Sequence, residues 1–133
     1  MAPAIASINE MKRLRLAERA TEVGAYLGQK LEQLQVRHPS IGEVRGIGMF
    51  WAVELVKNRT TKAPFNSYAD KISSKPLVVD RVAARALSNG VYLQSWVSHF
   101  VIAPPLIISH EDIDHGVAVL DDALSIADAE VEP

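Results

Sequence analysis

The side chains best suited to acid–base or metal chemistry in this sequence are histidines, since the chain contains no cysteine. There are four of them: His38, His99, His110 and His115. The last two are five positions apart, so a helix would not place them on one face, as it does metal ligands spaced three or four apart. Serine, histidine and aspartate follow no order that identifies a catalytic triad, and Asp121-Asp122 is expected on the solvent face of a helix. The sequence therefore predicts neither a metal site nor a complete set of catalytic residues.

The stretch Gly46-Ile47-Gly48 could be taken for a phosphate-binding loop. It lacks the third glycine of a dinucleotide-binding fingerprint. A predicted strand also follows it, instead of the helix whose N-terminal amides would bind a phosphate. A bulge or tight bend between two strands accounts better for these glycines.

The segment Gln94-Ser95-Trp96-Val97-Ser98-His99 joins two predicted strands and mixes large aromatic with polar side chains. Loops at strand ends supply many ligand-binding and interface residues, so one interpretation is a binding loop. The alternative, equally compatible with the sequence, is a hairpin turn whose Trp96 covers the core.

These residues have to be positioned by the helices and strands that the apolar spacing predicts. A long first helix is predicted over 1–38, because apolar side chains recur every three or four positions from Ile8 to Leu34 and His38-Pro39 ends the run. Gly24 lies inside this stripe, which indicates close packing of the helix against a neighbour.

The rest of the chain alternates between strands and helices. Strands are predicted within 41–56 and 91–103, and helices over 76–89 and 110–129, with Ser74 and Ser109 as their expected N-caps and Asn89-Gly90 as a stop. The polar connection from Lys57 to Lys75 is long enough to suggest a functional or interface loop. This order predicts a single α+β domain over 1–133, with a mainly antiparallel sheet of three to four strands and flanking helices.

The composition is that of an ordinary globular domain, with 48% hydrophobic and 23% charged residues. A formal net charge of −2 and scattered basic residues give no reason to expect a nucleic-acid partner. No apolar run approaches the roughly 20 residues that span a bilayer. The absence of cysteine fits a reducing compartment. We therefore expect a cytoplasmic protein that binds neither nucleic acid nor membrane.

Four stretches stand out in this order along the chain: 19–27, 45–48 with the strand to 55, 89–92 and 104–109. Together they resemble class III aminotransferases. The segment from Arg19 to Leu27 resembles the family's domain-linking helix. Arg45-Gly46-Ile47-Gly48, with the strand that ends in Glu54-Leu55, resembles its R-G-x-G and E-L signature. Asn89-Gly90-Val91-Tyr92 resembles its G-V strand entry, and Pro104-Pro105-Leu106-Ile107-Ile108-Ser109 resembles its P-P-L-x-I-T/S ending.

The resemblance implies a fold type I enzyme that transfers an amino group between an amine or amino acid and a keto acid or aldehyde. In that family pyridoxal phosphate forms a Schiff base with a lysine of the large domain, which precedes the first helix seen here. None of the lysines of this chain matches the cofactor-lysine motif. The resemblance therefore implies a C-terminal small domain without catalytic or cofactor-binding residues of its own. Such a domain would be inactive alone, with the large domain as its partner and a homo-oligomer as the expected assembly.

The resemblance also indicates a substrate pocket. Many members carry an arginine that binds a substrate carboxylate three residues before the double proline, where this chain has Val101. Valine there favours the branch of the family that acts on ω-amines. The preceding loop, which begins at Gln94, contains no arginine as a substitute. The candidate substrate-pocket residues are Gln94, Trp96, His99 and Val101.

Two other functions stay open on the sequence. One is a free-standing, non-catalytic interaction or small-molecule-binding domain derived from an aminotransferase, which would expose apolar surface and self-associate. The other is a generic regulatory ligand-binding domain, for which the sequence offers no motif.

Overall fold

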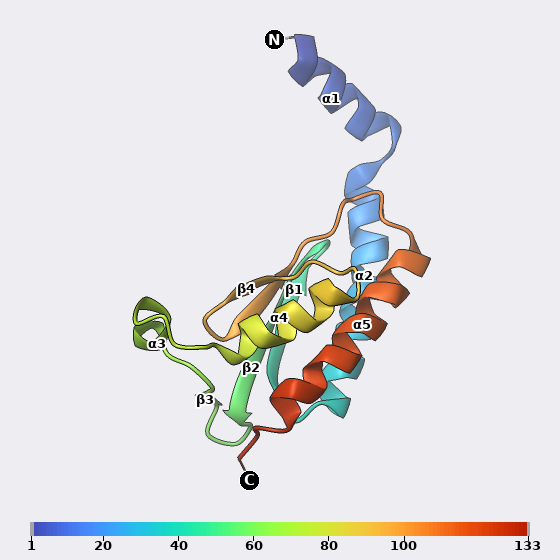
Figure 1. Cartoon of the computed structure of the whole chain (residues 1–133). Helices are drawn as coiled ribbons and strands as arrows, with labels where there is room; N and C mark the ends of the chain where they lie inside the picture. Colours follow the sequence, from blue (N-terminus) through green and yellow to red (C-terminus); the bar gives the residue numbers. More distant parts are fainter. Residues whose placement is uncertain (1, 133) are drawn as a thin grey trace.

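A computed structural model describes residues 2–132 and shows helices packed on one face of a small antiparallel sheet (Figure 1). The helices are α1 (Ala2–Arg13), α2 (Leu16–Arg37), α3 (Tyr68–Ile72), α4 (Val78–Ser88) and α5 (His110–Asp128). The strands are β1 (Ile41–Ile47), β2 (Phe50–Asn58), β3 (Ala63–Pro64), β4 (Gln94–Trp96) and β5 (His99–Ile102). The strand order is β1-β2-β5-β4, with β3 paired to β2. The predicted α+β class is confirmed.

The predicted first helix is in fact two helices. Arg15 separates them with a positive φ of 49°, a left-handed conformation that disfavours a continuous right-handed helix. Helix α1 projects from the body of the molecule (Figure 1), and its side chains from Pro3 to Arg13 are exposed. The prediction of one helix over 1–38 is wrong because the apolar spacing continues through the break and no glycine or proline marks it.

The core lies between the sheet and helices α2, α4 and α5. Apolar side chains repeat along the inner face of each helix, and burying them supplies the main stabilisation of the fold. Those from the helices include Val23, Leu27, Leu31, Leu34, Val79, Val82, Ala86, Ile113, Leu120 and Leu124. From the sheet, Ile41, Val53, Leu55 and Phe100 are fully buried beneath them.

Helix α2 approaches the β1–β2 hairpin closely through two glycines. A Cβ atom on Gly24 would collide with the carbonyl oxygen of Gly48, and one on Gly28 would collide with the Trp51 ring. Gly48 adopts a φ of +56° in the turn between the strands, a conformation that glycine tolerates best. Its carbonyl accepts a hydrogen bond of 2.8 Å from Trp51 Nε1. The predicted tight bend at 46–48 and the predicted close packing at Gly24 are both confirmed.

The long polar connection contains two elements that the sequence did not indicate, β3 and α3. Ser67 and Asp70 form a reciprocal capping box at the start of α3. The expected cap at Ser74 is wrong, because Ser74 has a φ of 56° and α4 begins only at Val78. Asn66 supplies the missing cap from the connection, since its Oδ1 accepts the Val78 amide at 2.9 Å.

The predicted strand over Val91–Gln94 is shifted. The Val91 amide donates to the Ala86 carbonyl at 3.0 Å, which holds this segment at the end of α4 instead of in the sheet. Strand β4 therefore starts at Gln94, and the hairpin with β5 turns tightly at Val97-Ser98. Val97 has a positive φ of 49° in this turn.

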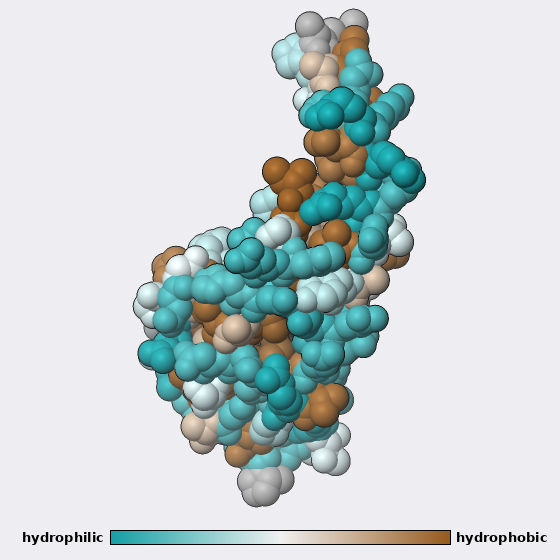
Figure 2. All heavy atoms as spheres, turned by 90° about the vertical axis from the view of Figure 1, so that its right-hand side faces the viewer, coloured by the Kyte–Doolittle hydropathy of each residue, from teal (hydrophilic) through white to brown (hydrophobic). Residues whose placement is uncertain are grey.

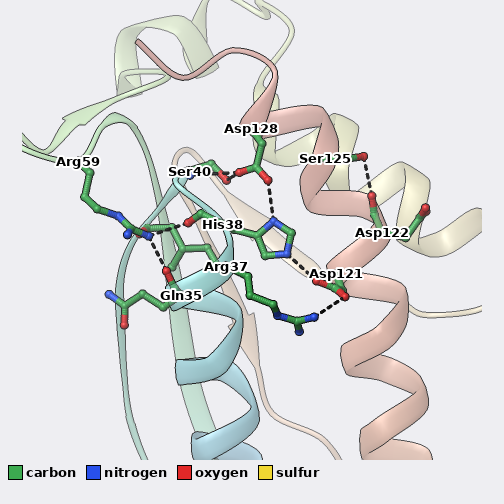
Figure 3. Close-up of polar contacts among 10 residues, drawn as sticks. Gln35, Arg37, His38, Ser40, Arg59, Asp121, Asp122, Ser125 and Asp128 are labelled. Carbon is green, nitrogen blue, oxygen red and sulfur yellow. Dashed lines mark hydrogen bonds and ion pairs between the residues drawn. The ribbon is translucent and has the colours of Figure 1, made fainter. Parts of the chain in front are cut away.

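A polar cluster joins the end of α2 to the last turns of α5 (Figure 3). His38 is only 8% exposed, with Nδ1 2.6 Å from an Asp128 oxygen and Nε2 2.6 Å from an Asp121 oxygen. The other Asp128 oxygen accepts from the hydroxyl and amide of Ser40 at the start of β1. The expected solvent-facing position of Asp121 is therefore wrong, because the carboxylate turns toward His38 and Arg37.

Arg59 closes the same end of α2 from the other side. Its guanidinium donates to the carbonyls of Gln35, His38 and Ile41 at 2.5, 2.6 and 3.0 Å. The last carbonyls of a helix have no partners within the helix and carry partial negative charge, so a cation satisfies them well.

The glycine contact gives a direct test of the packing. Replacing Gly24 by alanine should lower the free energy of unfolding by roughly 1–3 kcal/mol, because the new methyl group meets the Gly48 backbone. Gly116→Ala in α5 is the matched control, since nothing lies within 4 Å of its Cβ position. That change should stabilise the chain by up to about 1 kcal/mol through helix propensity. Urea unfolding compares the two, and equal effects would contradict the packing.

The polar cluster gives a second test, in which aspartate is changed to asparagine at two positions of α5. Asp128→Asn should cost about 1–3 kcal/mol of unfolding free energy, because it weakens the bonds to His38 and Ser40 in a half-buried site. Asp122→Asn is the control, because Asp122 pairs with Arg85 at the surface. We expect that variant to unfold at the urea concentration of the unmodified chain. A control as unstable as Asp128→Asn would show that the cluster has no special role.

Candidate functional site

One face of the sheet is left uncovered by helices α2, α4 and α5, and we call it the open face. Residues paired across antiparallel strands point to the same side, so the register defines its two complete rows and a shorter third. The first row runs Glu43, Glu54, His99, Trp96; the second runs Arg45, Ala52, Val101, Gln94; the third holds Ile47 and Phe50. The rows between them, such as Val44, Val53, Phe100 and Ser95, face the helices.

All four candidate pocket residues lie on the open face. Trp96 is opposite His99, and Gln94 is opposite Val101 in the next row. Trp96 is 50% exposed, whereas His99 and Val101 are half-buried by their neighbours. The face therefore offers an aromatic ring, an imidazole, an amide and an aliphatic side chain within two adjacent rows.

Helix α3 adds one residue that sequence reasoning missed. The Lys71 ammonium lies 4.6 Å from the centre of the Trp96 ring, within the range of a cation–π interaction. The neighbouring Asp70 does not neutralise it, because that carboxylate is bound by Lys75 and by Ser67. These contacts hold the pKa of Asp70 well below its usual value, with the Lys75 ammonium as the main cause. Only the unusual length of the connection suggested a functional element here.

On the open face, the charged side chains of β1 and β2 pair with one another. Arg45 donates to Glu54 at 2.8 Å and to Glu43 at 3.0 Å. The bond to Glu54 is the main reason why the pKa of Arg45 is raised above its usual value. Arg45 is thereby committed to two carboxylates and is not a free anion-binding group.

A cavity of about 540 Å³ opens where the sheet meets α2 and α5. Its walls are mainly apolar and come from α2, α5 and the segments 90–94 and 101–105, so Gln94 and Val101 stand at the junction of the cavity and the open face. The polar side chains among its lining residues are Tyr92, Gln94, Asp112 and His115. No lysine lines it, so the cavity cannot hold pyridoxal phosphate as a Schiff base.

The polar cluster of Figure 3 contains serine, aspartate and histidine but not in a catalytic order. In a triad the histidine lies between the nucleophile and the aspartate. Here Asp128 lies between Ser40 and His38, and Ser40 is fully buried. The arrangement joins secondary-structure elements and does not activate the hydroxyl.

Two other features are absent from residues 2–132. No group of three or more histidine, cysteine, aspartate or glutamate side chains in that part of the chain could hold a metal ion. Nor is any helix there long and apolar enough to cross a membrane.

Comparisons with known proteins agree on one family. The family model described as Aminotransferase class-III matches residues 1–124. Taurine–pyruvate aminotransferase of Bilophila wadsworthia is 33% identical over 131 residues, which cover 93% of this chain and 27% of that protein. Isoleucine 2-epimerase of Lentilactobacillus buchneri is 33% identical over 125 residues, covering 93% of this chain and 26% of that protein.

The fold agrees as well. The structure of taurine:2-oxoglutarate aminotransferase from Bifidobacterium kashiwanohense, in complex with pyridoxal phosphate and glutamate, superposes with a TM-score of 0.85 at 26% identity. The match covers 96% of this chain and 28% of that one. The chain thus spans about a quarter of the length of these relatives. The family match, the shared fold and the ordered sequence motifs together establish that this chain belongs to the class III aminotransferases.

Proposed function

We propose that this chain is the C-terminal small domain of a pyridoxal-phosphate-dependent aminotransferase, with its open face turned toward the active site of the large domain. The observation that carries the proposal is the placement of Gln94, Trp96, His99 and Val101 together on the one sheet face that the helices leave uncovered. The coverage of only about a quarter of each relative supports a separate large domain as the partner.

The chain itself would bind and orient substrate and exclude water, and it would form no bond to the cofactor. Pyridoxal phosphate, when bound by the large domain, supplies an electron sink for the amino-group transfer. In the proposed enzyme, Trp96 and Val101 contact the carbon skeleton of the substrate. Gln94 and His99 provide hydrogen-bonding groups beside it.

Exposed apolar side chains support the large domain as partner. On the open face Ile47 is 85% and Phe50 61% exposed, and α1 exposes Ile5, Ile8 and Met11. Figure 2 shows apolar side chains along the projecting α1. Surfaces of this kind are favourable contact areas for another domain, and they would also promote self-association of the chain. The family resemblance leads us to propose a homo-oligomer of the full-length enzyme as the assembly.

The substrate that this face favours is an amine without a carboxylate beside Val101. The row that contains Val101, Ala52 and Gln94 carries a charge only at Arg45, which is occupied by two glutamates. A carboxylate placed against Val101 would lose water without gaining a partner. This supports the ω-amine branch of the family.

The first experiment adds pyridoxal phosphate to the purified chain and then borohydride, and records the visible spectrum and any modified lysine by mass spectrometry. We expect no specific lysine adduct on the chain alone. The full-length polypeptide that joins this domain to its large domain should show an aldimine band and transaminate. The same polypeptide with the large-domain lysine changed to alanine is the control.

Two outcomes would contradict the proposal. Reduction onto a single lysine of the isolated chain would place the cofactor here. A full-length polypeptide that binds the cofactor but transfers no amino group would show that the domain serves another reaction of the family.

A further inference from the structure

Nearly every cation of the chain is already matched by an oxygen partner. Within residues 2–132, acidic side chains pair with Arg13, Arg15, Lys30, Arg37, Arg45, Lys57, Lys75, Arg81 and Arg85. Backbone carbonyls accept from Arg19, Arg59 and Lys62. Lys12, on the exposed α1, and Lys71 are the two lysine or arginine residues of this described region without such a partner.

Lys71 differs from Lys12 in its position. Its ammonium lies over Trp96, which is on the open face opposite His99 and one row from Val101. The cation–π contact orients the ammonium and leaves the donors that point away from the ring available to an anion. Lys71 is thus the one lysine or arginine within residues 2–132 that lies against a residue of the candidate pocket and has no oxygen partner.

We propose that Lys71 determines acceptor specificity by binding the carboxylate of the 2-oxo acid. The proposal rests on the proposed function, which turns the open face toward the active site. A carboxylate held by Lys71 would direct the remaining carbon skeleton along Trp96 toward Val101, where the surface is aromatic and aliphatic. The amine donor, which lacks a carboxylate, would need the same apolar surface but not the ammonium.

Local structure supports a fixed position for this ammonium. The reciprocal capping box of Ser67 and Asp70 starts α3, and the Lys75 ammonium closes the same segment onto Asp70 at 2.6 Å. Because the Asp70 carboxylate is bound by Ser67 and Lys75, it does not compete with a substrate anion for Lys71. A preformed cation costs less ordering when the anion arrives.

The test uses the full-length enzyme with pyruvate as the amino acceptor. The amino donor is 1-phenylethylamine, which has no carboxylate. Lys71→Met keeps an unbranched side chain beside Trp96 but removes the charge. It should raise KM for pyruvate by about tenfold, the usual size of a lost hydrogen bond to a charged group, while KM for the amine stays within about twofold. Lys71→Arg should restore most of the pyruvate affinity. Lys57→Gln removes a positive charge paired with Glu132 and should change neither constant.

The outcomes separate this proposal from the proposed function. An enzyme that transaminates, but whose Lys71→Met variant keeps the KM for pyruvate or raises both constants equally, overturns the role of Lys71 alone. A full-length polypeptide without any transaminase activity overturns both. A tenfold change confined to pyruvate, reversed by Lys71→Arg, supports both, because a merely structural role would weaken the two substrates alike.

Discussion

The closeness of α2 to the β1–β2 hairpin is the constraint from which the rest of this architecture follows. Gly24 brings the helix backbone against the Gly48 carbonyl, and Gly28 leaves room for the Trp51 ring. With the helix held at this distance, its apolar stripe joins one buried cluster with Val53 and Leu55, and α4 and α5 complete the same layer. All three packed helices thereby occupy one face of the sheet. Within residues 2–132 none of these three helices covers the opposite face, which is the open face.

The other end of α2 is fixed by hydrogen bonds and ion pairs instead of by close packing. His38 bridges two aspartates of α5, and Arg59 holds three carbonyls from the opposite side. Charged groups can be half-buried here because each one finds a partner of opposite charge or a hydrogen-bonding oxygen. An interaction of this kind is directional, whereas apolar packing is not. The cluster therefore fixes the rotation of α5 relative to α2, and with it the cavity wall that the two helices share.

The sequence predicted the parts of the fold that follow from local periodicity and from glycine chemistry. These parts are the antiparallel sheet, helices α4 and α5, the bend at Gly48 and the close packing at Gly24. The break at Arg15 could not be predicted, because the apolar spacing is the same on both sides of it. The cap of α4 by Asn66 depends on a contact across 12 positions of the chain, which local patterns do not encode.

The sequence also predicted only part of the candidate site. Trp96, His99, Gln94 and Val101 stood out by residue type and by the family resemblance, and the strand register then placed them on one face. Lys71 was not identified, because its significance lies in what surrounds it. A lysine in a polar connection is unremarkable until the structure shows that it lies over Trp96 and that its acidic neighbour is already bound.

The residues that carry the family resemblance serve the fold more than the chemistry. Arg45 and Glu54, the two charged residues of the R-G-x-G and E-L signature, bind each other across the hairpin, and Gly48 forms its turn. Arg19 donates to the Leu106 and Ile108 carbonyls and so fixes the segment after the double proline. In the proposed function, substrate selection falls instead to side chains outside these motifs, on the open face and at α3. Residues that mark the family and residues that select the substrate would then be different, which fits a fold shared by relatives named for transamination and for epimerisation.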